Sequence, residues 1–234
     1  MLYATKNIQM KHYLFLILLV GGSLSGCAGS YRSYYHTLEY VFKDKSINVT
    51  KEHVANSAID LMHITVDGEV EAVVVLAFMD GDKYRWASGD KAIFTMHHGV
   101  IVQTEGLATD LHYTSHLTDN PLVGEDALAY SWDRFVDVDG AEYGAPVRST
   151  WRVEGESTQL FFDEPINTLK VVETVEFSDN TPYFKTGLSW ENIYYLDATT
   201  KYLLSSKQKY HPDGRVYEMV YLSRAQRALA RRND

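Results

Sequence analysis

Turn-forming residue pairs divide most of this chain into short segments, and this pattern constrains its fold more than any other feature. Asp67-Gly68 is typical of a two-residue β-hairpin. Later pairs favour further turns: Asp80-Gly81, Gly89-Asp90, His98-Gly99, Asp139-Gly140, Gly155-Glu156 and Asp213-Gly214. Short strands joined by local turns are typical of an antiparallel meander. A parallel sheet would require strands that alternate with helices, and the sequence lacks that alternation. The sequence therefore predicts a mainly β fold.

The segments between these turns are rich in the β-branched and aromatic residues that strands favour. Ala72–Met79 and Val216–Leu222 have little polar character on either face, so both sides of the sheet should be covered there. We expect a large antiparallel meander bent into a half-barrel or sandwich-like sheet, with a break at Asn120–Ala127. The predicted strands are Leu61–Val66, Glu69–Met79, Lys83–Ser88, Ala92–His97, Val100–Glu105, Ser131–Val138, Val147–Glu154, Leu160–Phe162, Leu169–Phe177, Leu188–Leu196, Tyr202–Tyr210 and Val216–Leu222.

Short helices are expected at both ends of the sheet. An N-terminal helix packed on the sheet is indicated by apolar residues on one helical face, namely Tyr34, Leu38, Val41 and Phe42. Thr50 is a candidate N-cap for a further helical turn that reaches Ser57. The sequence Ser223-Arg224-Ala225-Gln226 matches a capping box, which predicts a short C-terminal helix.

The predicted C-terminal helix carries the main basic cluster of an acidic chain. Arg227, Arg231 and Arg232 follow the capping box within ten residues. Contact with an acidic glycan or with lipid head groups is the functional interpretation of this cluster. A solvated helix at a frayed chain end is the plainer interpretation, and both stay open at this point.

An apolar run near the N-terminus leads to Cys27, the sole cysteine of the chain. The run Tyr13–Val20 follows Lys6 and Lys11 and is far shorter than the roughly 20 residues that a membrane-spanning helix needs. Such a segment is typical of a signal peptide. Leu24, Ser25 and Gly26 in front of Cys27 resemble the lipobox of bacterial lipoproteins, in which the cysteine is acylated and becomes the new N-terminus.

The lipobox resemblance implies a division of the chain into three parts. Residues 1–26 form the removed signal peptide, residues 27–33 the lipidated N-terminus and tether, and residues 34–234 one β-rich periplasmic domain. Diacylglycerol and palmitate on Cys27 would hold the protein in a membrane. Ala28 takes the place of the aspartate that retains such proteins at the inner membrane, which favours the outer membrane. A buried core cysteine is the alternative, and translation from Met10 in place of Met1 also stays open.

The charge balance restricts the partners that the domain can have. The chain has 22 basic and 31 acidic residues, a net charge of −9. Removal of residues 1–26 takes away Lys6 and Lys11 and no acidic residue, which leaves 20 against 31, or −11. A domain of this charge is repelled by nucleic-acid phosphates and by anionic membrane surfaces. We therefore expect no nucleic-acid partner and expect the lipid anchor to hold the protein on the membrane.

No motif of catalysis or cofactor binding occurs in the sequence. Phosphate-binding loops, dinucleotide-binding glycine patterns and the G-x-S-x-G nucleophile motif are all missing. His112 and His116 are four residues apart, but on a strand this spacing separates their side chains by about 13 Å. His97 and His98 are adjacent and would point to opposite faces or lie in a turn. We predict no catalytic residue, no metal site and no cofactor, and the ligand-binding residues are unknown.

Carboxylates and aromatic residues leave room for a glycan-active enzyme or a sugar-binding surface. Any two carboxylates could form a glycosidase pair, but no spacing singles out a pair. Asp82 and Asp90 lie in predicted turns, where aspartate serves the backbone. Sugar-stacking platforms could be formed by the tryptophans Trp86, Trp132, Trp151 and Trp190. Core packing is the competing interpretation, because aromatic residues are ordinary strand residues.

Several sequence segments, taken in order, resemble the YjbF/GfcB family of outer-membrane lipoproteins. That family has a W-x-S-x-D strand end followed by a G-x-[IL]-V-x-T-x-G-L run, which Trp86–Asp90 and Gly99–Leu107 resemble here. Ala87 and Gly89 differ from the residues most often found there. The remaining matching segments are Val74–Phe78, Pro121-Leu122, Tyr194–Ala198, Leu203–Gln208 and Glu218–Leu222.

The resemblance implies a function in exporting or assembling extracellular or capsular polysaccharide, including the group-four capsule. It implies polysaccharide-secretion proteins as partners, an extracellular polysaccharide as a ligand, and no catalytic residue. Two alternatives remain. A carrier would hold an acyl chain or lipoprotein in a half-barrel cavity, and a glycan-active enzyme would need an open cleft with two facing carboxylates.

Overall fold

The computed structural model describes residues 49–123, 131–140, 143–177 and 188–232. The signal peptide, Leu24–Cys27, the tether and the predicted helix at residues 34–42 lie outside these ranges, as does the second half of the predicted break at Asn120–Ala127. None of the helices within the described ranges is both long and apolar enough to cross a membrane.

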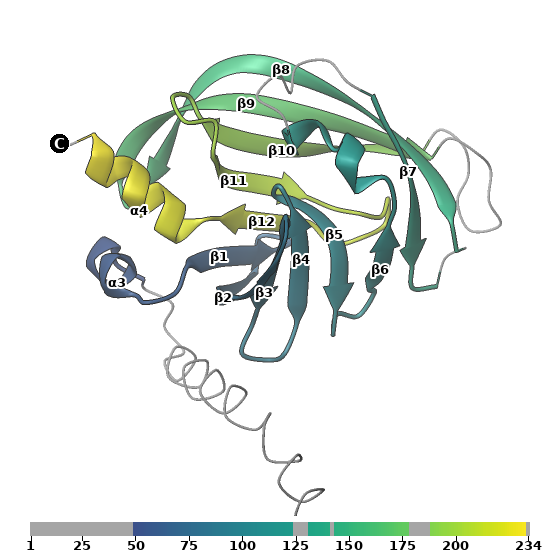
Figure 1. The fold of residues 1–234 in the computed structure, drawn as a ribbon, viewed down its shortest axis with the longest axis horizontal. Coiled ribbons are helices and arrows are strands. Elements are labelled where there is room, and N and C mark those ends of the chain that lie inside the picture. The colour runs from purple at the N-terminus through teal and green to yellow at the C-terminus, as the bar shows by residue number, and fades with distance from the viewer. Residues whose placement is uncertain (1–48, 124–130, 141–142, 178–187, 233–234) are drawn as a thin grey trace, which may run out of the picture. The chain divides into compact units, whose positions relative to one another are not determined.

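The described domain is one antiparallel sheet of twelve strands that curves until its two edges nearly meet (Figure 1). The strand order is β5-β4-β3-β2-β1-β12-β11-β10-β9-β8-β7-β6. The bounds are β1 Leu61–Val66, β2 Val70–Asp80, β3 Lys83–Ala87, β4 Ile93–His97, β5 Val100–Glu105, β6 Leu111–Thr114, β7 Ser131–Val138, β8 Ala145–Phe161, β9 Glu164–Phe177, β10 Ser189–Asp197, β11 Leu203–Gln208 and β12 Tyr217–Val220. The predicted mainly β fold is confirmed, but a two-layered sandwich is not formed.

The predicted hairpin turns hold best where a glycine takes the second turn position. Asp67 and Gly68 both have positive φ, 53° and 76°, but Val66 pairs with Val70, so this loop has three residues where the sequence predicts two. His98 and Gly99 also have positive φ, 50° and 91°, between β4 and β5. A Cβ atom on Gly99 would collide with the side chain of Leu203, so this position needs glycine for space as well.

The turn predicted at Gly155-Glu156 is wrong. β8 runs through this point, so the predicted strands Val147–Glu154 and Leu160–Phe162 are parts of one 17-residue strand. The pairing of β8 with β9 shifts between Val153 and Gly155, and Gly155 has φ of 123°. Glycine here forms a β-bulge that bends the long hairpin. The chain reverses instead at Phe162 and Asp163, which have φ of 52° and 62°.

Two consecutive meanders build the sheet, and β1 pairs with β12 to join them. β5 and β6 are the two edges of the strand order, and side chains connect them. Thr114 Oγ1 donates to Val102 O at 2.9 Å, and Leu111 N donates to Thr104 Oγ1 at 2.9 Å. These bonds close the curved sheet beside a strand, β6, that the sequence reading missed.

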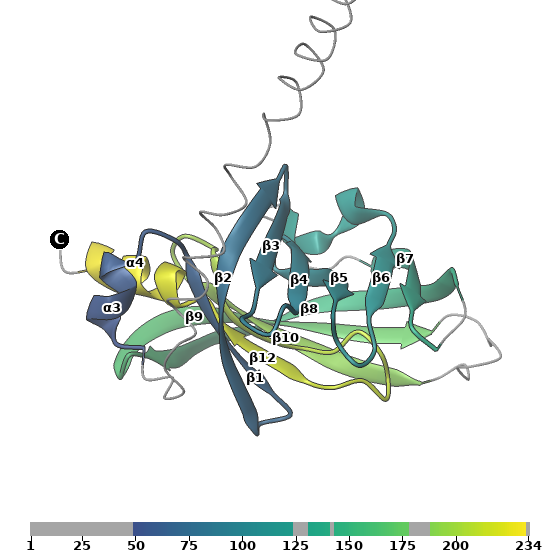
Figure 2. The same cartoon turned by 90° about the horizontal axis from the view of Figure 1, so that it is seen from below.

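Two short helices lie next to each other beside the start of β1 (Figure 2). In α3 (Lys51–Asn56), Thr50 Oγ1 accepts from His53 N at 3.2 Å, which confirms the predicted N-cap. α4 (Leu222–Arg231) confirms the C-terminal helix, but the predicted capping box is wrong. The helix begins two residues earlier, with Tyr221 as its N-cap, and Ser223 Oγ accepts instead from Leu61 N at 2.9 Å.

The core lies inside the curved sheet and is filled by large side chains. All four tryptophans are buried, with exposed fractions of 1% for Trp86, 0% for Trp132, 3% for Trp151 and 7% for Trp190. The hypothesis of tryptophan sugar-stacking platforms is therefore wrong, and core packing is confirmed. The loop between β6 and β7 contains the short 3-10 helices η1 (Leu117–Asp119) and η2 (Pro121–Val123).

Candidate functional site

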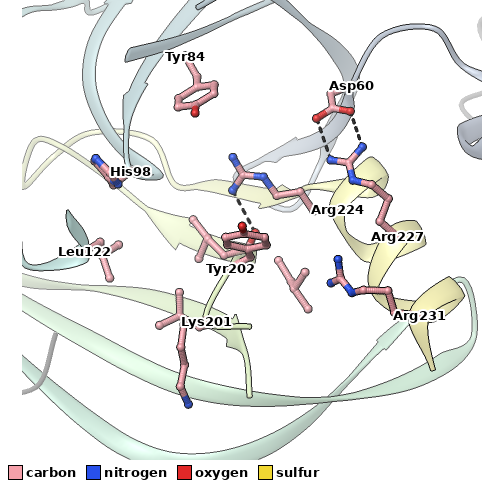
Figure 3. A pocket seen from close by; sticks show the side chains of 12 residues that line it. Asp60, Tyr84, His98, Leu122, Lys201, Tyr202, Arg224, Arg227 and Arg231 are labelled. Atoms are coloured by element: carbon pink, nitrogen blue, oxygen red, sulfur yellow. Dashed lines mark hydrogen bonds and ion pairs between the residues drawn. The ribbon is translucent and has the colours of Figure 1, made fainter. Parts of the chain in front are cut away.

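A cleft of about 450 Å³ lies between α4 and one end of the curved sheet (Figure 3). One wall is α4, and the other walls come from β3, the β4–β5 turn, η2 and the segment joining β10 to β11. The volume falls within the range of about 300–1,000 Å³ that small-ligand sites occupy. The lining residues are Asp60, Tyr84, His98, Leu122, Leu196, Lys201, Tyr202, Leu203, Leu204, Arg224, Arg227 and Arg231.

Helical periodicity places three arginines of α4 on the cleft side. Arg224, Arg227 and Arg231 are spaced i, i+3 and i+7, so they share one helix face. The next face packs into a small apolar cluster formed by Ala225, Ala228 and Leu229 with Phe161, Ile166 and Leu204. Because this apolar face is fixed against β8, β9 and β11, the arginines are presented to the cleft as a fixed row.

Two of the three arginines are already held by the protein. Arg227 forms a bidentate pair with Asp60, from NH1 to Oδ1 at 2.7 Å and from NH2 to Oδ2 at 3.0 Å. This pairing raises the pKa of Arg227. Arg224 NH1 donates to Leu203 O at 3.2 Å, and its guanidinium lies 4.4 Å from the centre of the Tyr221 ring. Such contacts orient both guanidinium groups and reduce the entropy lost on binding a ligand.

Other donors in the cleft have no partner among the residues that the structure describes. Arg231 forms no hydrogen bond or ion pair with them. His98 Nε2 is buried and also makes no hydrogen bond there. The hydroxyl-bearing ring of Tyr202 is 63% exposed, and Figure 3 shows Tyr84 and Tyr202 facing the same space as Arg224. The cleft therefore combines free cationic and neutral donors with aromatic surface.

The charge of the cleft is opposite to that of the whole chain. Its described lining carries Lys201, Arg224, Arg227 and Arg231 against one carboxylate, Asp60, a balance of 4 − 1 = +3. That carboxylate is bound by Arg227, so it is not available as a general base. No second carboxylate faces it within the described lining, and the cleft thus lacks the pair that a glycosidase needs. The arrangement is suited to binding an anion.

A second cleft of about 480 Å³ lies near the β1–β2 hairpin and contains two carboxylates, Asp90 and Asp213. Asp90 accepts from Ser88 Oγ within its own turn, which is the backbone role that the sequence predicts for it. Arg215 also lines this cleft, and its remaining walls are mostly apolar or small residues, from β1, β2 and β4, from the segment after β5 and from the segment around the start of β12. Nothing in this arrangement assigns an acid and a base.

Asp82, His97 and His98 bring three metal-ligating atoms within 4.8 Å of one another. The side chain of Asn120 opposes metal binding there. Its Oδ1 accepts from Leu122 N, while its Nδ2 donates to His97 O at 2.8 Å and lies 3.3 Å from His97 Nδ1. His97 Nδ1 therefore accepts from the Asn120 amide, and the proton of the His97 ring lies on Nε2. Neither ring nitrogen of His97 then has a free lone pair for a metal ion. Burial, and secondly His98, lowers the pKa of His97.

The other histidines considered from the sequence have separate environments. His112 Nε2 lies 2.6 Å from Asp139 Oδ1, and this bond raises the pKa of His112. His116 has a left-handed backbone with φ of 51° and precedes η1. Its ring lies 5.9 Å from that of Phe135. The structure gives the two histidines different partners.

A buried ion pair fills part of the interior of the sheet. Arg134 NH2 lies 3.0 Å from Glu173 Oε1, and the two side chains are 8% and 0% exposed. Glu173 Oε2 accepts from Asn192 Nδ2 at 2.9 Å and from Tyr194 OH at 3.0 Å. The cavity beside this network measures about 20 Å³, which is too small for an acyl chain. This part of the interior therefore gives no support to the lipid-carrier hypothesis, whereas the second cleft of about 480 Å³ has mostly apolar walls.

Fold and site together define a class: a curved antiparallel sheet with a packed interior that presents a basic cleft at one end. The model of the family described as "Group 4 capsule polysaccharide lipoprotein gfcB, YjbF" matches residues 35–222 of this sequence. The chain therefore belongs to that family, as the sequence resemblance implies. The residues of the cleft from Asp60 to Leu204 lie within the match, whereas most of α4 follows it.

Two relatives from Escherichia coli K12 cover most of this chain. One, named "Uncharacterized lipoprotein GfcB", is 24% identical over 209 residues, which are 86% of this chain and 94% of the relative. The other, named "Uncharacterized lipoprotein YjbF", is 23% identical over 189 residues, 78% of this chain and 84% of the relative. The crystal structure of the hypothetical lipoprotein YmcC from the same organism has the same fold. It superposes with a TM-score of 0.65 at 20% identity, over 75% of this chain and 89% of that one.

Proposed function

We propose that this protein is a non-enzymatic lipoprotein of the outer membrane that acts in the export or assembly of an extracellular or capsular polysaccharide. The family membership is the observation that carries the proposal, because the description of the family names its members as lipoproteins of the group 4 capsule polysaccharide. The basic cleft supports a binding function, since it offers donors without the paired carboxylates of a glycosidase.

The proposed location depends on Cys27, which is outside the described residues. Acylation of Cys27 would anchor the protein, and Ala28 favours the outer membrane with the domain in the periplasm. Several acyl chains are needed for lasting attachment, because one chain gives only marginal binding. In this position the domain would meet polysaccharide and other secretion proteins as the polymer crosses the periplasm.

The test is a clean deletion of the gene in the source bacterium, under conditions in which the wild type makes surface polysaccharide. We expect less polysaccharide at the cell surface, restoration by the wild-type chain, and no restoration by Cys27→Ala. Fractionation should find the Cys27→Ala protein folded but displaced from the outer membrane. Periplasmic polymer should also be measured, since accumulation there indicates a block in export and its absence a block in assembly. Unchanged surface polysaccharide in the deletion strain would overturn the proposal.

A further inference from the structure

The basic cleft contains donors that the protein's own bonds do not explain. Asp60 neutralises Arg227, and Arg224 is partly used by Leu203 O. Arg231 makes no such bond in the described part of the chain, although it lines the same cleft from the same helix face.

The positive charge of this cleft calls for an anion. Three excess positive charges gather in about 450 Å³ of a protein whose net charge is −9. The planar guanidinium groups of Arg224 and Arg231 suit the two oxygens of a carboxylate or phosphate group. Because Asp60 occupies the fork of Arg227, the free guanidinium capacity lies with the other two arginines.

The remaining walls favour a sugar over a lipid tail. Tyr84 and Tyr202 combine a flat apolar ring with a hydroxyl group, which matches a sugar's apolar ring face and its polar edge. The aliphatic lining is mostly part of the core, with exposed fractions of 7% for Leu196, 4% for Leu203 and 1% for Leu204. These leucines leave little apolar surface on which an acyl chain could lie.

We infer that this cleft binds a carboxylate-bearing sugar of an acidic polysaccharide, with Arg231 and Arg224 holding the carboxylate and Tyr202 contacting the sugar ring. The inference rests on the proposed function and names the ligand class that the site takes. Arg227 is a positioning residue, because its bond to Asp60 fixes α4 at the start of β1 and so keeps the arginine row in place.

The test measures binding of trigalacturonate to the purified lipidated protein in detergent micelles, by isothermal titration calorimetry. Maltotriose, which has three sugars and no carboxylate, is the matched neutral probe. We expect binding of the acidic probe that weakens as salt rises and no binding of the neutral one. Arg231→Gln should weaken binding about tenfold, or about 1.4 kcal/mol, as the loss of one charged hydrogen bond predicts. A folded Arg231→Gln is expected, since the side chain has no partner among the described residues.

Arg232→Gln is the control variant, because it removes the same charge from the C-cap of the same helix, outside the cleft; it also removes the hydrogen bond that the Arg232 guanidinium donates to Pro165 O. We expect a change of less than twofold with this variant. Equal losses for Arg231→Gln and Arg232→Gln, or equal binding of both trisaccharides, would overturn the inference. So would Arg231-dependent binding of phosphatidylglycerol vesicles or of inorganic phosphate in preference to trigalacturonate. A loss of surface polysaccharide on gene deletion without trigalacturonate binding would leave the proposed function standing and remove only this site assignment.

Discussion

The buried pair of Arg134 and Glu173 allows a direct test of how the sheet interior is stabilised. We consider Glu173→Gln, which keeps the shape of the side chain and removes its charge. Arg134 would then be a buried cation facing a neutral amide, and its NH2 group 3.0 Å from Glu173 Oε1 would meet an NH2 donor or an uncharged oxygen. One amide oxygen would also have to serve both Asn192 and Tyr194, which now bond to Glu173 Oε2.

Removing one partner of a buried ion pair destabilises a protein by about 3–5 kcal/mol, because the other charge is left without compensation. Whole domains have free energies of unfolding of about 5–15 kcal/mol, so the loss should be large but measurable. The double variant Arg134→Met/Glu173→Gln removes both charges. We expect it to be less destabilised than the sum of the two single variants, by about 1–3 kcal/mol.

The assay is urea unfolding followed by tryptophan fluorescence, which reports on this region because Arg134 lies 4.1 Å from the centre of the Trp132 ring. The surface pair of Arg148 and Asp133 is the control. Its side chains are 52% and 61% exposed, and Asp133→Asn should change stability by less than about 1 kcal/mol. A loss below about 1 kcal/mol for Glu173→Gln, or full additivity in the double variant, would refute the reasoning.

Two further predictions concern the same interior. Gln208→Leu leaves Gly99 O and Ile101 N without the bonds that they now make to Gln208 at 2.8 and 3.0 Å. Each bond is worth about 1–3 kcal/mol, so the variant should be destabilised by about 2–6 kcal/mol in urea unfolding. A change under about 1 kcal/mol would contradict this prediction. Burial raises the pKa of Tyr221 to about 12, so the folded state keeps a proton that the unfolded state loses above pH 10. The tyrosine's contribution is therefore fully present below pH 10 and falls by about 3 kcal/mol by pH 12. Tyr221→Phe should have the same free energy of unfolding as the wild type near pH 7, because the buried hydroxyl makes no hydrogen bond in the described structure. Between pH 10 and 12 the variant should lose less stability than the wild type. Parallel losses in the two proteins would count against this assignment.

Local signals explain which strands could be predicted from the sequence. Asp67-Gly68 and His98-Gly99 correctly predict turns, because glycine tolerates the positive φ that the second position of each turn requires. The β8–β9 turn gave no such signal, because Phe162 and Asp163 take positive φ without glycine. Gly155 misled the prediction for the opposite reason, since a glycine within a strand forms a bulge as readily as a turn.

The cleft depends on contacts that no local pattern encodes. The arginine cluster of α4 is visible in the sequence, but its neighbours come from residues as distant as Tyr84 and His98. The plainer reading of a solvated terminal helix therefore overlooked the opposite wall. The Arg134–Glu173 pair was missed because the two residues are 39 positions apart and meet only when the sheet curves. An alternating strand pattern such as Trp132, Arg134, Val136 marks Arg134 as inward-facing, but it does not identify the partner.

The net charge of the chain and the local charge of the cleft lead to different expectations for different polyanions. At physiological ionic strength the Debye length is about 8 Å, so a ligand group inside the cleft responds mainly to the +3 balance of its lining. Duplex DNA carries one negative charge per about 1.7 Å of its axis, so any DNA segment that reached the cleft would bring many further charges against the acidic surface. A polysaccharide with one carboxylate on each acidic sugar can place a single group in the cleft and keep its neutral edges on the remaining surface. Selection by charge spacing therefore reconciles an expected absence of nucleic-acid binding with the acidic-glycan binding that we infer for the same protein.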